Sequence, residues 1–160
     1  MASKLGPPIT PGGMSVLKTR YDHLLGTERP EIVEIVSWAA GNGDRSENGD
    51  YLYGRKRMRE IDRELGYLAR RMKALRVVDP ANQPDKSRVF FGARVELADE
   101  EDTRQIITIV GDDEQDAGSG LVGWSSPIAK ALRGAAIGDL KTVRLPSGTK
   151  EWEVMAIHYA

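Results

Sequence analysis

Residues 58–75 read MREIDRELGYLARRMKAL, and their apolar positions recur at alternating spacings of three and four. This is the a/d pattern of a coiled-coil seam. The same spacing occurs upstream at Met14, Leu17, Tyr21 and Leu24. In an antiparallel hairpin, the residue numbers of facing positions have a constant sum, and these two series pair with a constant sum of 89. The sequence therefore predicts two helical arms that fold back on each other near residue 44.

Each expected arm has about 30 residues and a length of roughly 45 Å. Pro30 lies within the first arm, where a proline costs about 3 kcal/mol unless the helix kinks or restarts. Glu28 also occupies the seam position that should face Ile61. We therefore expect the register to slip here and the arm to resume with a bend. Five residues then supply apolar cover: Ile32, Val33, Ile35, Val36 and Trp38.

Composition narrows the class of protein. The chain has 160 residues and no cysteine, which excludes disulfides and thiolate metal sites. It has no apolar run near 18 residues and no basic-then-apolar leader, so we expect a soluble, cytoplasmic protein. Residues 1–80 carry 14 Lys and Arg against 11 Asp and Glu, so the first half is basic and the second acidic.

The expected organisation has four parts. Residues 1–9 have too little periodic apolar content to pack and are expected to form a loose arm. Residues 10–79 form the hairpin, and residues 80–87, with two prolines, form a linker. Residues 88–160 show the alternation of short strands, and Ser126-Pro127 begins one short helix. The expected class is α+β, with the coiled-coil hairpin followed by a small antiparallel sheet domain that carries one helix.

Acidic residues gather where the arms meet, at Asp44, Glu47 and Asp50. One reading is helix capping, because Asp44 followed three residues later by Glu47 has the form of a cap. The other reading is a metal site, because two carboxylates three residues apart suit Mg²⁺, which usually takes one or two protein carboxylates. Such a pair would complete a site already present on a partner, and we expect no tightly bound metal in the free protein.

The second arm is strongly basic after this turn. Arg55 to Arg59 contains four cations and no acid. At about 100° per residue, Arg55 and Arg59 lie opposite the seam with Lys56 beside them. A solvated helix exterior is the simpler interpretation for the later arginines, which alternate with acids. The tight cluster favours a polyanion as partner.

The remaining tyrosines, histidines, acidic loop and glycines say less about function. Tyr51 and Tyr53 either stack on a base or pack against Trp38. The two histidines are interpreted as structural, and residues 111–114, GDDE, as a hairpin loop rather than a calcium site. Gly49 and Gly54 predict a looser start to the second arm, by up to about 1 kcal/mol each.

These motifs together resemble the Gre family of bacterial transcript cleavage factors, and within it the GreB branch. The resemblance covers nearly all of the chain after the N-terminal arm. It rests on Thr10 with Gly13 and Leu17, on residues 28–31 (ERPE), 38–40 (WAA), 43–48 (GDRSEN), 59–63 (REIDR) and 89–93 (VFFGA), and on Ser126-Pro127 with Ala129, Ala131 and Leu132.

The resemblance implies a C-terminal domain similar to FK506-binding proteins and a partner, RNA polymerase, whose secondary channel receives the hairpin. It implies that Asp44 and Glu47 help to hold the second Mg²⁺ of the polymerase active site and orient the attacking water. It assigns Arg55 and Lys56, with Arg59 beside them, to the extruded RNA 3′ end. Ser126 and Pro127 match the loop assigned to polymerase binding. The implied protein is a cofactor of the polymerase rather than an enzyme, and we expect it to be a monomer.

Two other functions compete with transcript cleavage. A regulator could occupy the same channel without promoting cleavage, although Asp44 and Glu47 argue against it. A prolyl isomerase or chaperone module would need an aromatic pocket for proline. The chain has only two phenylalanines, Phe90 and Phe91, so such a pocket is hard to assemble.

Overall fold

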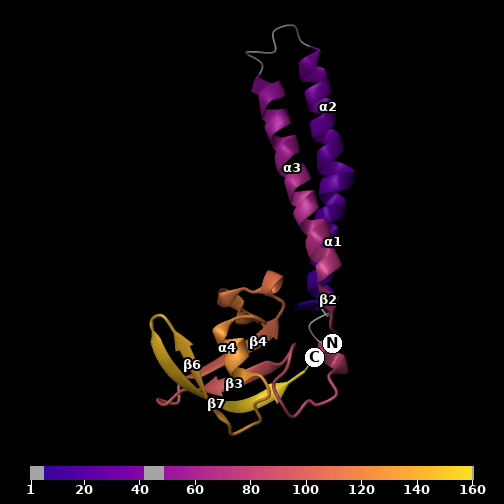
Figure 1. Cartoon of the computed structure of the whole chain (residues 1–160). Coiled ribbons are helices and arrows are strands. Elements are labelled where there is room, and N and C mark those ends of the chain that lie inside the picture. The colour runs from indigo at the N-terminus through magenta and orange to yellow at the C-terminus, as the bar shows by residue number, and fades with distance from the viewer. Residues whose placement is uncertain (1–5, 42–48, 160) are drawn as a thin grey trace. The chain divides into compact units, whose positions relative to one another are not determined.

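The computed structural model describes residues 6–41 and 49–159, and the chain divides into two compact units. One unit is Met14–Ala74, and the other combines the chain on either side of it. Figure 1 shows the helices of the first unit and the sheet of the second. None of the helices in the described residues is both long enough and apolar enough to cross a membrane.

The first unit is a helical hairpin, as the seam spacing predicts. Its first arm consists of α1 (Pro11–His23), a π-helical turn (Leu24–Glu28) and α2 (Arg29–Ala40), and its second arm is the single helix α3 (Gly49–Ala74). In Figure 1, α2 and α3 run side by side. Four side chains form the buried seam: Leu24, Ile32, Ile61 and Leu68. Leu17, Tyr21, Val36, Met58, Leu65 and Met72 pack around them.

The expected register slip takes the form of the π turn. The Arg29 N–H donates to the Leu24 carbonyl, five residues back, so this turn is wider than an α-helical turn. Pro30 follows in the first turn of α2. A proline ring in a regular helix collides with the carbonyl four residues earlier, and a wider turn relieves that collision. The first arm therefore continues through Pro30 without breaking.

The expected apolar cover beyond Pro30 is only partly correct. Ile32 is buried and Val36 is half-buried, but Val33, Ile35 and Trp38 are exposed. The reason is that one stripe of α2 is enough to meet α3.

Gly54 has a packing role that the sequence did not indicate. It is buried in α3, and a Cβ there would lie 2.6 Å from Val36 Cγ2 on α2. The glycine therefore allows close approach of the two helices.

The second unit is built on a five-stranded sheet of order β5-β4-β3-β7-β6. Its strands are β3 (Arg94–Ala98), β4 (Arg104–Val110), β5 (Leu121–Gly123), β6 (Leu140–Leu145) and β7 (Gly148–His158). The helix α4 (Pro127–Leu132) buries Ala129 and Leu132 in the same core as Val95, Ile109 and Trp152.

The sheet is mixed, so the expectation of an antiparallel sheet is wrong at one edge. β5 pairs parallel with β4, with Thr108 beside Leu121. Two 3₁₀ turns, Asp112–Glu114 and Ala117–Ser119, lie between these strands. They bring the chain back beside Thr108, in the second half of β4, so that β5 runs in the same direction as β4. Residues 111–114 are therefore not the hairpin loop expected from the sequence.

Pro8 and Ile9 form a short strand, so the expected loose arm, residues 1–9, is wrong for its last two residues. β1 (Pro8–Ile9) pairs parallel with β2 (Arg76–Val77), and Ile9 is fully buried. The Glu114 carboxylate accepts hydrogen bonds from the Thr10 hydroxyl, from the Thr10 N–H at 3.1 Å and from the Gly111 N–H at 2.8 Å. These contacts hold Thr10, the residue before α1, within the second unit.

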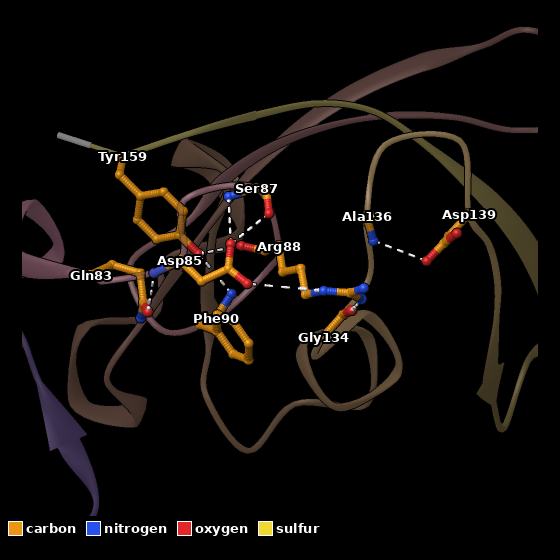
Figure 2. Close-up of polar contacts among 9 residues, drawn as sticks. All are labelled: Gln83, Asp85, Ser87, Arg88, Phe90, Gly134, Ala136, Asp139 and Tyr159. Atoms are coloured by element: carbon orange, nitrogen blue, oxygen red, sulfur yellow. Dashed lines mark hydrogen bonds and ion pairs between the residues drawn. The ribbon is translucent and has the colours of Figure 1, made fainter.

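The expected linker, residues 80–87, belongs to the second unit and is held by local contacts. Asp79 caps a short 3₁₀ turn, Pro80–Asn82. Figure 2 shows contacts of the residues that directly follow the linker. The Tyr159 hydroxyl donates to the Arg88 carbonyl at 2.7 Å and accepts from the Phe90 N–H at 2.8 Å. Burial raises the pKa of Tyr159 above its ordinary value of 10.0.

Candidate functional site

Asp44 and Glu47 lie outside the described residues. In the sequence they fall between α2, which ends at Ala40, and α3, which begins at Gly49. Their assignment as metal and water ligands therefore stays a prediction. Asp50, the third acid expected here, is exposed in the first turn of α3.

The described residues contain no alternative metal site. Across residues 6–41 and 49–159, no group of three or more His, Cys, Asp or Glu side chains is arranged to hold an ion.

The basic cluster after the turn divides between two roles. Arg57 turns toward the first arm, where its guanidinium is paired with Glu28, with Nε 2.8 Å from Oε1. A second carboxylate, Glu60, lies 3.6 Å from it. The hydrogen bond to Glu28 holds the pKa of Arg57 above its ordinary value, against the opposing effect of burial. Arg57 thus joins the two arms and is not available to a ligand.

Arg55, Lys56 and Arg59 are exposed on α3, and we call them the basic face. The Arg55 guanidinium lies 5.8 Å from the centre of the Tyr51 ring and donates from Nη1 to the Tyr51 hydroxyl at 3.0 Å. Within the described part of the chain, neither Lys56 nor Arg59 has an ion-pair partner. The basic face therefore presents three cations on about one helical turn, an arrangement suited to phosphate groups.

The choice left open for the tyrosines is partly resolved. Tyr53 is 60% exposed and Trp38 is 62% exposed, so neither is covered by packing on the other. Tyr51 is engaged by Arg55 instead.

Two further ion pairs join the arms. Arg20 contacts Glu64 through Nε at 2.8 Å and Nη2 at 3.0 Å, and Arg29 contacts Asp62 at 2.8 Å. The hydrogen bond from Arg20 lowers the pKa of Glu64 from its ordinary value of 4.5. These pairs connect the first arm to the second.

Ser126 and Pro127 lie together at the start of α4. The Ser126 hydroxyl accepts from the Ala129 N–H at 3.3 Å, and Pro127 occupies the first helical turn. One residue earlier, the Ser125 N–H donates to Asp112 Oδ1 at 2.9 Å. Pro127 is exposed and Ser126 is half-buried, so the loop presents a fixed surface.

The side chain of Arg133 supports this loop, although nothing in the sequence singled it out. Its guanidinium lies 3.6 Å from the centre of the Trp124 ring and donates to the Trp124 carbonyl. The Trp124 ring in turn meets Phe91 edge to face at 5.8 Å. Burial lowers the pKa of Arg133, and the charge of Asp112 opposes that shift. A contact between residues nine apart, in a turn and after a helix, has no periodic signal that could have revealed it.

Comparison with known proteins identifies related sequences over both units. The family "Transcription elongation factor, N-terminal" matches residues 7–77, and "Transcription elongation factor, GreA/GreB, C-term" matches residues 83–159. Transcription elongation factor GreB of Neisseria meningitidis serogroup B is 48% identical over 151 residues, which cover 94% of this chain and 93% of that protein. GreB of Xanthomonas axonopodis pv. citri is 44% identical over 160 residues, which cover 99% and 95%.

A more distant likeness is found among solved structures. The crystal structure of GreA factor homolog 1 (Gfh1) of Thermus thermophilus covers 96% of this chain and 99% of its own. The two share 20% sequence identity with a TM-score of 0.43.

Proposed function

Because this chain belongs to the GreA/GreB family of transcription elongation factors, we propose that it binds RNA polymerase and stimulates hydrolytic cleavage of backtracked RNA. Cleavage at the RNA 3′ end would release arrested complexes. The observation that carries the proposal is the 48% identity to a GreB protein over 94% of the chain. The exposed basic face supports it, because a free surface for RNA is what this function requires.

The basic face is proposed to hold the extruded RNA strand. Arg55, Lys56 and Arg59 would bind successive phosphates, and such contacts release counterions without reading sequence. The contact between Arg55 and Tyr51 limits the rotamers of that guanidinium and so reduces the entropy lost on binding.

The acidic turn is proposed to act at the cleavage step. Asp44 and Glu47 would hold a Mg²⁺ ion shared with the polymerase active site, since carboxylates are suitable ligands for it. The ion would supply charge stabilisation and a more acidic water. In this proposal the two carboxylates also orient the attacking water, and the hairpin delivers them as a unit.

The second unit is proposed to dock on the polymerase through Ser126 and Pro127. The cap at Ser126 and the Arg133–Trp124 stack keep this loop in one conformation. We further propose that the hairpin enters by the secondary channel of the polymerase and that the sheet unit is similar to FK506-binding proteins.

In this function the protein is a monomeric cytoplasmic cofactor, and the polymerase performs the hydrolysis. The direct test is a cleavage assay on purified RNA polymerase elongation complexes stalled in the backtracked state. We expect the wild-type chain to shorten the transcript from its 3′ end and to restore elongation. Binding without shortening would instead identify a channel regulator, and no binding would contradict the proposal.

A further inference from the structure

The Tyr159 hydroxyl takes the place of a strand on one side of residues 88–90. In an extended segment, the backbone groups of alternate residues point to opposite sides. Arg88 and Phe90 share a side, and the same hydroxyl pairs with the carbonyl of Arg88 at 2.7 Å and with the N–H of Phe90 at 2.8 Å (Figure 2). One side-chain oxygen thus satisfies two backbone groups that would otherwise need a neighbouring strand or water.

The opposite side of the same segment holds the chain that leaves α4. The Val89 N–H donates to the Ala135 carbonyl at 2.9 Å, and the Val89 carbonyl accepts from the Gly134 N–H at 2.7 Å. The Arg88 guanidinium donates to the Gly134 carbonyl at 2.8 Å. Val89 and Ala135 are both fully buried. The segment therefore fixes the residues directly after α4 by three hydrogen bonds.

The segment also reaches the loop before α4, through aromatic side chains. Phe91 directly follows it and meets the Trp124 ring edge to face at 5.8 Å. The other contact of Trp124 is the Arg133 guanidinium, 3.6 Å from the centre of its ring. Ser126 and Pro127, two and three residues after Trp124, begin α4, and we call them the docking loop. Both ends of α4 are thus connected to the segment that Tyr159 holds.

We propose that Tyr159 is a positioning residue for polymerase docking. Its hydroxyl fixes residues 88–90, and these in turn fix α4 and the docking loop. This inference rests on the proposed function and deepens it, because it assigns the orientation of the docking loop to a residue distant from it in the sequence. Tyr159 acts through Arg88 and Phe90, so it needs no contact of its own with the polymerase.

The first test removes only the hydroxyl. Tyr159→Phe keeps the ring, and we expect polymerase binding to weaken by about fivefold, the factor that corresponds to one net hydrogen bond. The cleavage rate at saturating concentrations of the chain should not change, because the hairpin is unaltered. Tyr67→Phe, which removes the same group from an exposed tyrosine of α3, is the control and should bind normally.

Hydrogen exchange supplies a local readout. In Tyr159→Phe, the amides of Phe90, Gly134 and Ala135 should exchange several-fold faster than in the wild type. The Thr108 amide, which donates to the Gly120 carbonyl at 2.8 Å between β4 and β5, should not change. Equal acceleration over the whole sheet would indicate a general loss of stability and would overturn the positioning role.

A double-mutant cycle tests the route from Tyr159 to the docking loop. Arg133→Ala removes the stack on Trp124 from the same connected set. Combined with Tyr159→Phe, it should weaken binding by less than the product of the two separate factors. Arg88→Ala, at a half-exposed side chain, removes the contact with Gly134 and should weaken binding as Tyr159→Phe does. Factors that multiply independently would overturn the proposal.

The two proposals fail in different ways. Failure of the wild-type chain to bind polymerase would overturn the proposed function together with this inference. Wild-type binding that Tyr159→Phe leaves unchanged would overturn the inference alone.

Discussion

Gly54 and Val36 are in such close contact across the hairpin that a Cβ at Gly54 would lie 2.6 Å from Val36 Cγ2. Gly54→Ala should therefore destabilise the hairpin by about 1–3 kcal/mol, even though alanine favours helix, because the methyl group overpacks the seam. The measurement is the free energy of unfolding by urea, followed by circular dichroism.

Gly66→Ala is the matched control for this prediction. Gly66 lies in the same helix, and a Cβ there would meet only the flexible end of Arg70. It should stabilise the protein by about 0.5–1 kcal/mol. Equal effects of the two substitutions would mean that the seam can relax around Gly54.

The Arg20–Glu64 pair should make stability depend on pH. Because the pKa of Glu64 is lowered in the folded state, the pair contributes fully above the ordinary value of 4.5 and less as the pH falls through the lowered value. Both side chains are partly exposed, so we expect a contribution of under about 1 kcal/mol. The difference in unfolding free energy between the wild type and Glu64→Gln should be present at pH 7 and absent at a pH below the lowered pKa of Glu64. A difference that is constant with pH would contradict this assignment.

Asp44 and Glu47 are expected to act in cleavage and not in docking. Asp44→Asn with Glu47→Gln should abolish stimulated transcript cleavage and leave polymerase binding intact, because the substitutions keep the shape of the side chains but remove their charge. Asp50→Asn, at an exposed acid of α3, is the control and should retain cleavage. Cleavage near the wild-type level in the double variant would exclude the proposed role.

The basic face should matter most for long backtracks. Replacing Arg55, Lys56 and Arg59 with alanine should impair cleavage of long extruded strands more than of dinucleotides, since only the longer strand extends along α3. The loss should be smaller at high salt, where phosphate contacts are weaker. The measurement is the cleavage rate as a function of backtrack length at two salt concentrations. Equal loss at every length would mean that these residues are a solvated helix exterior with no role in holding RNA.

Arg133 should hold the docking loop in place. Arg133→Ala removes the contact with Trp124, worth about 1–2 kcal/mol where the cation is partly desolvated. We expect lower stability of the second unit and weaker binding to polymerase, while the stability of the hairpin is unchanged. Arg144→Ala, at an exposed position of β6, is the control. Unchanged binding in Arg133→Ala would show that the cap at Ser126 alone fixes the loop.

The hairpin could be predicted from sequence because its signal is local and repeated. Leu17, Tyr21, Met58 and Leu65 follow the coiled-coil spacing, and each occupies the seam. Glu28 and Pro30 marked the place where the spacing fails. The form of the irregularity, a π turn, depends on backbone hydrogen bonds that the spacing does not specify.

The edges of the second unit could not be predicted in this way. β1 has two residues, Pro8 and Ile9, and is ordered by partners at Arg76 and Val77. The direction of β5 depends on the path of residues 111–120 and not on the alternation within Leu121–Gly123. Non-local pairings of this kind leave no periodic trace in so few residues.

For the candidate site, exposure was predictable and pairing was not. Helical spacing correctly placed Arg55, Lys56 and Arg59 away from the seam. It also left Arg57 out of that group, but it could not identify the partner of Arg57, because Glu28 lies on the other arm.

The π turn determines which single-residue deletions the first arm can accept without changing the side that its helix presents to α3. The buried positions Leu24 and Ile32 are eight residues apart, one more than a heptad. In an uninterrupted α-helix that extra residue would rotate everything beyond it by about 100° and carry Ile32 out of the seam. The wide turn absorbs the rotation, so the two halves of the arm stay in phase on either side of it. Deleting one residue at Gly26 should preserve that phase but restore the collision of Pro30 with the helix backbone. A deletion within α2 would instead turn Trp38 to a different side of the hairpin.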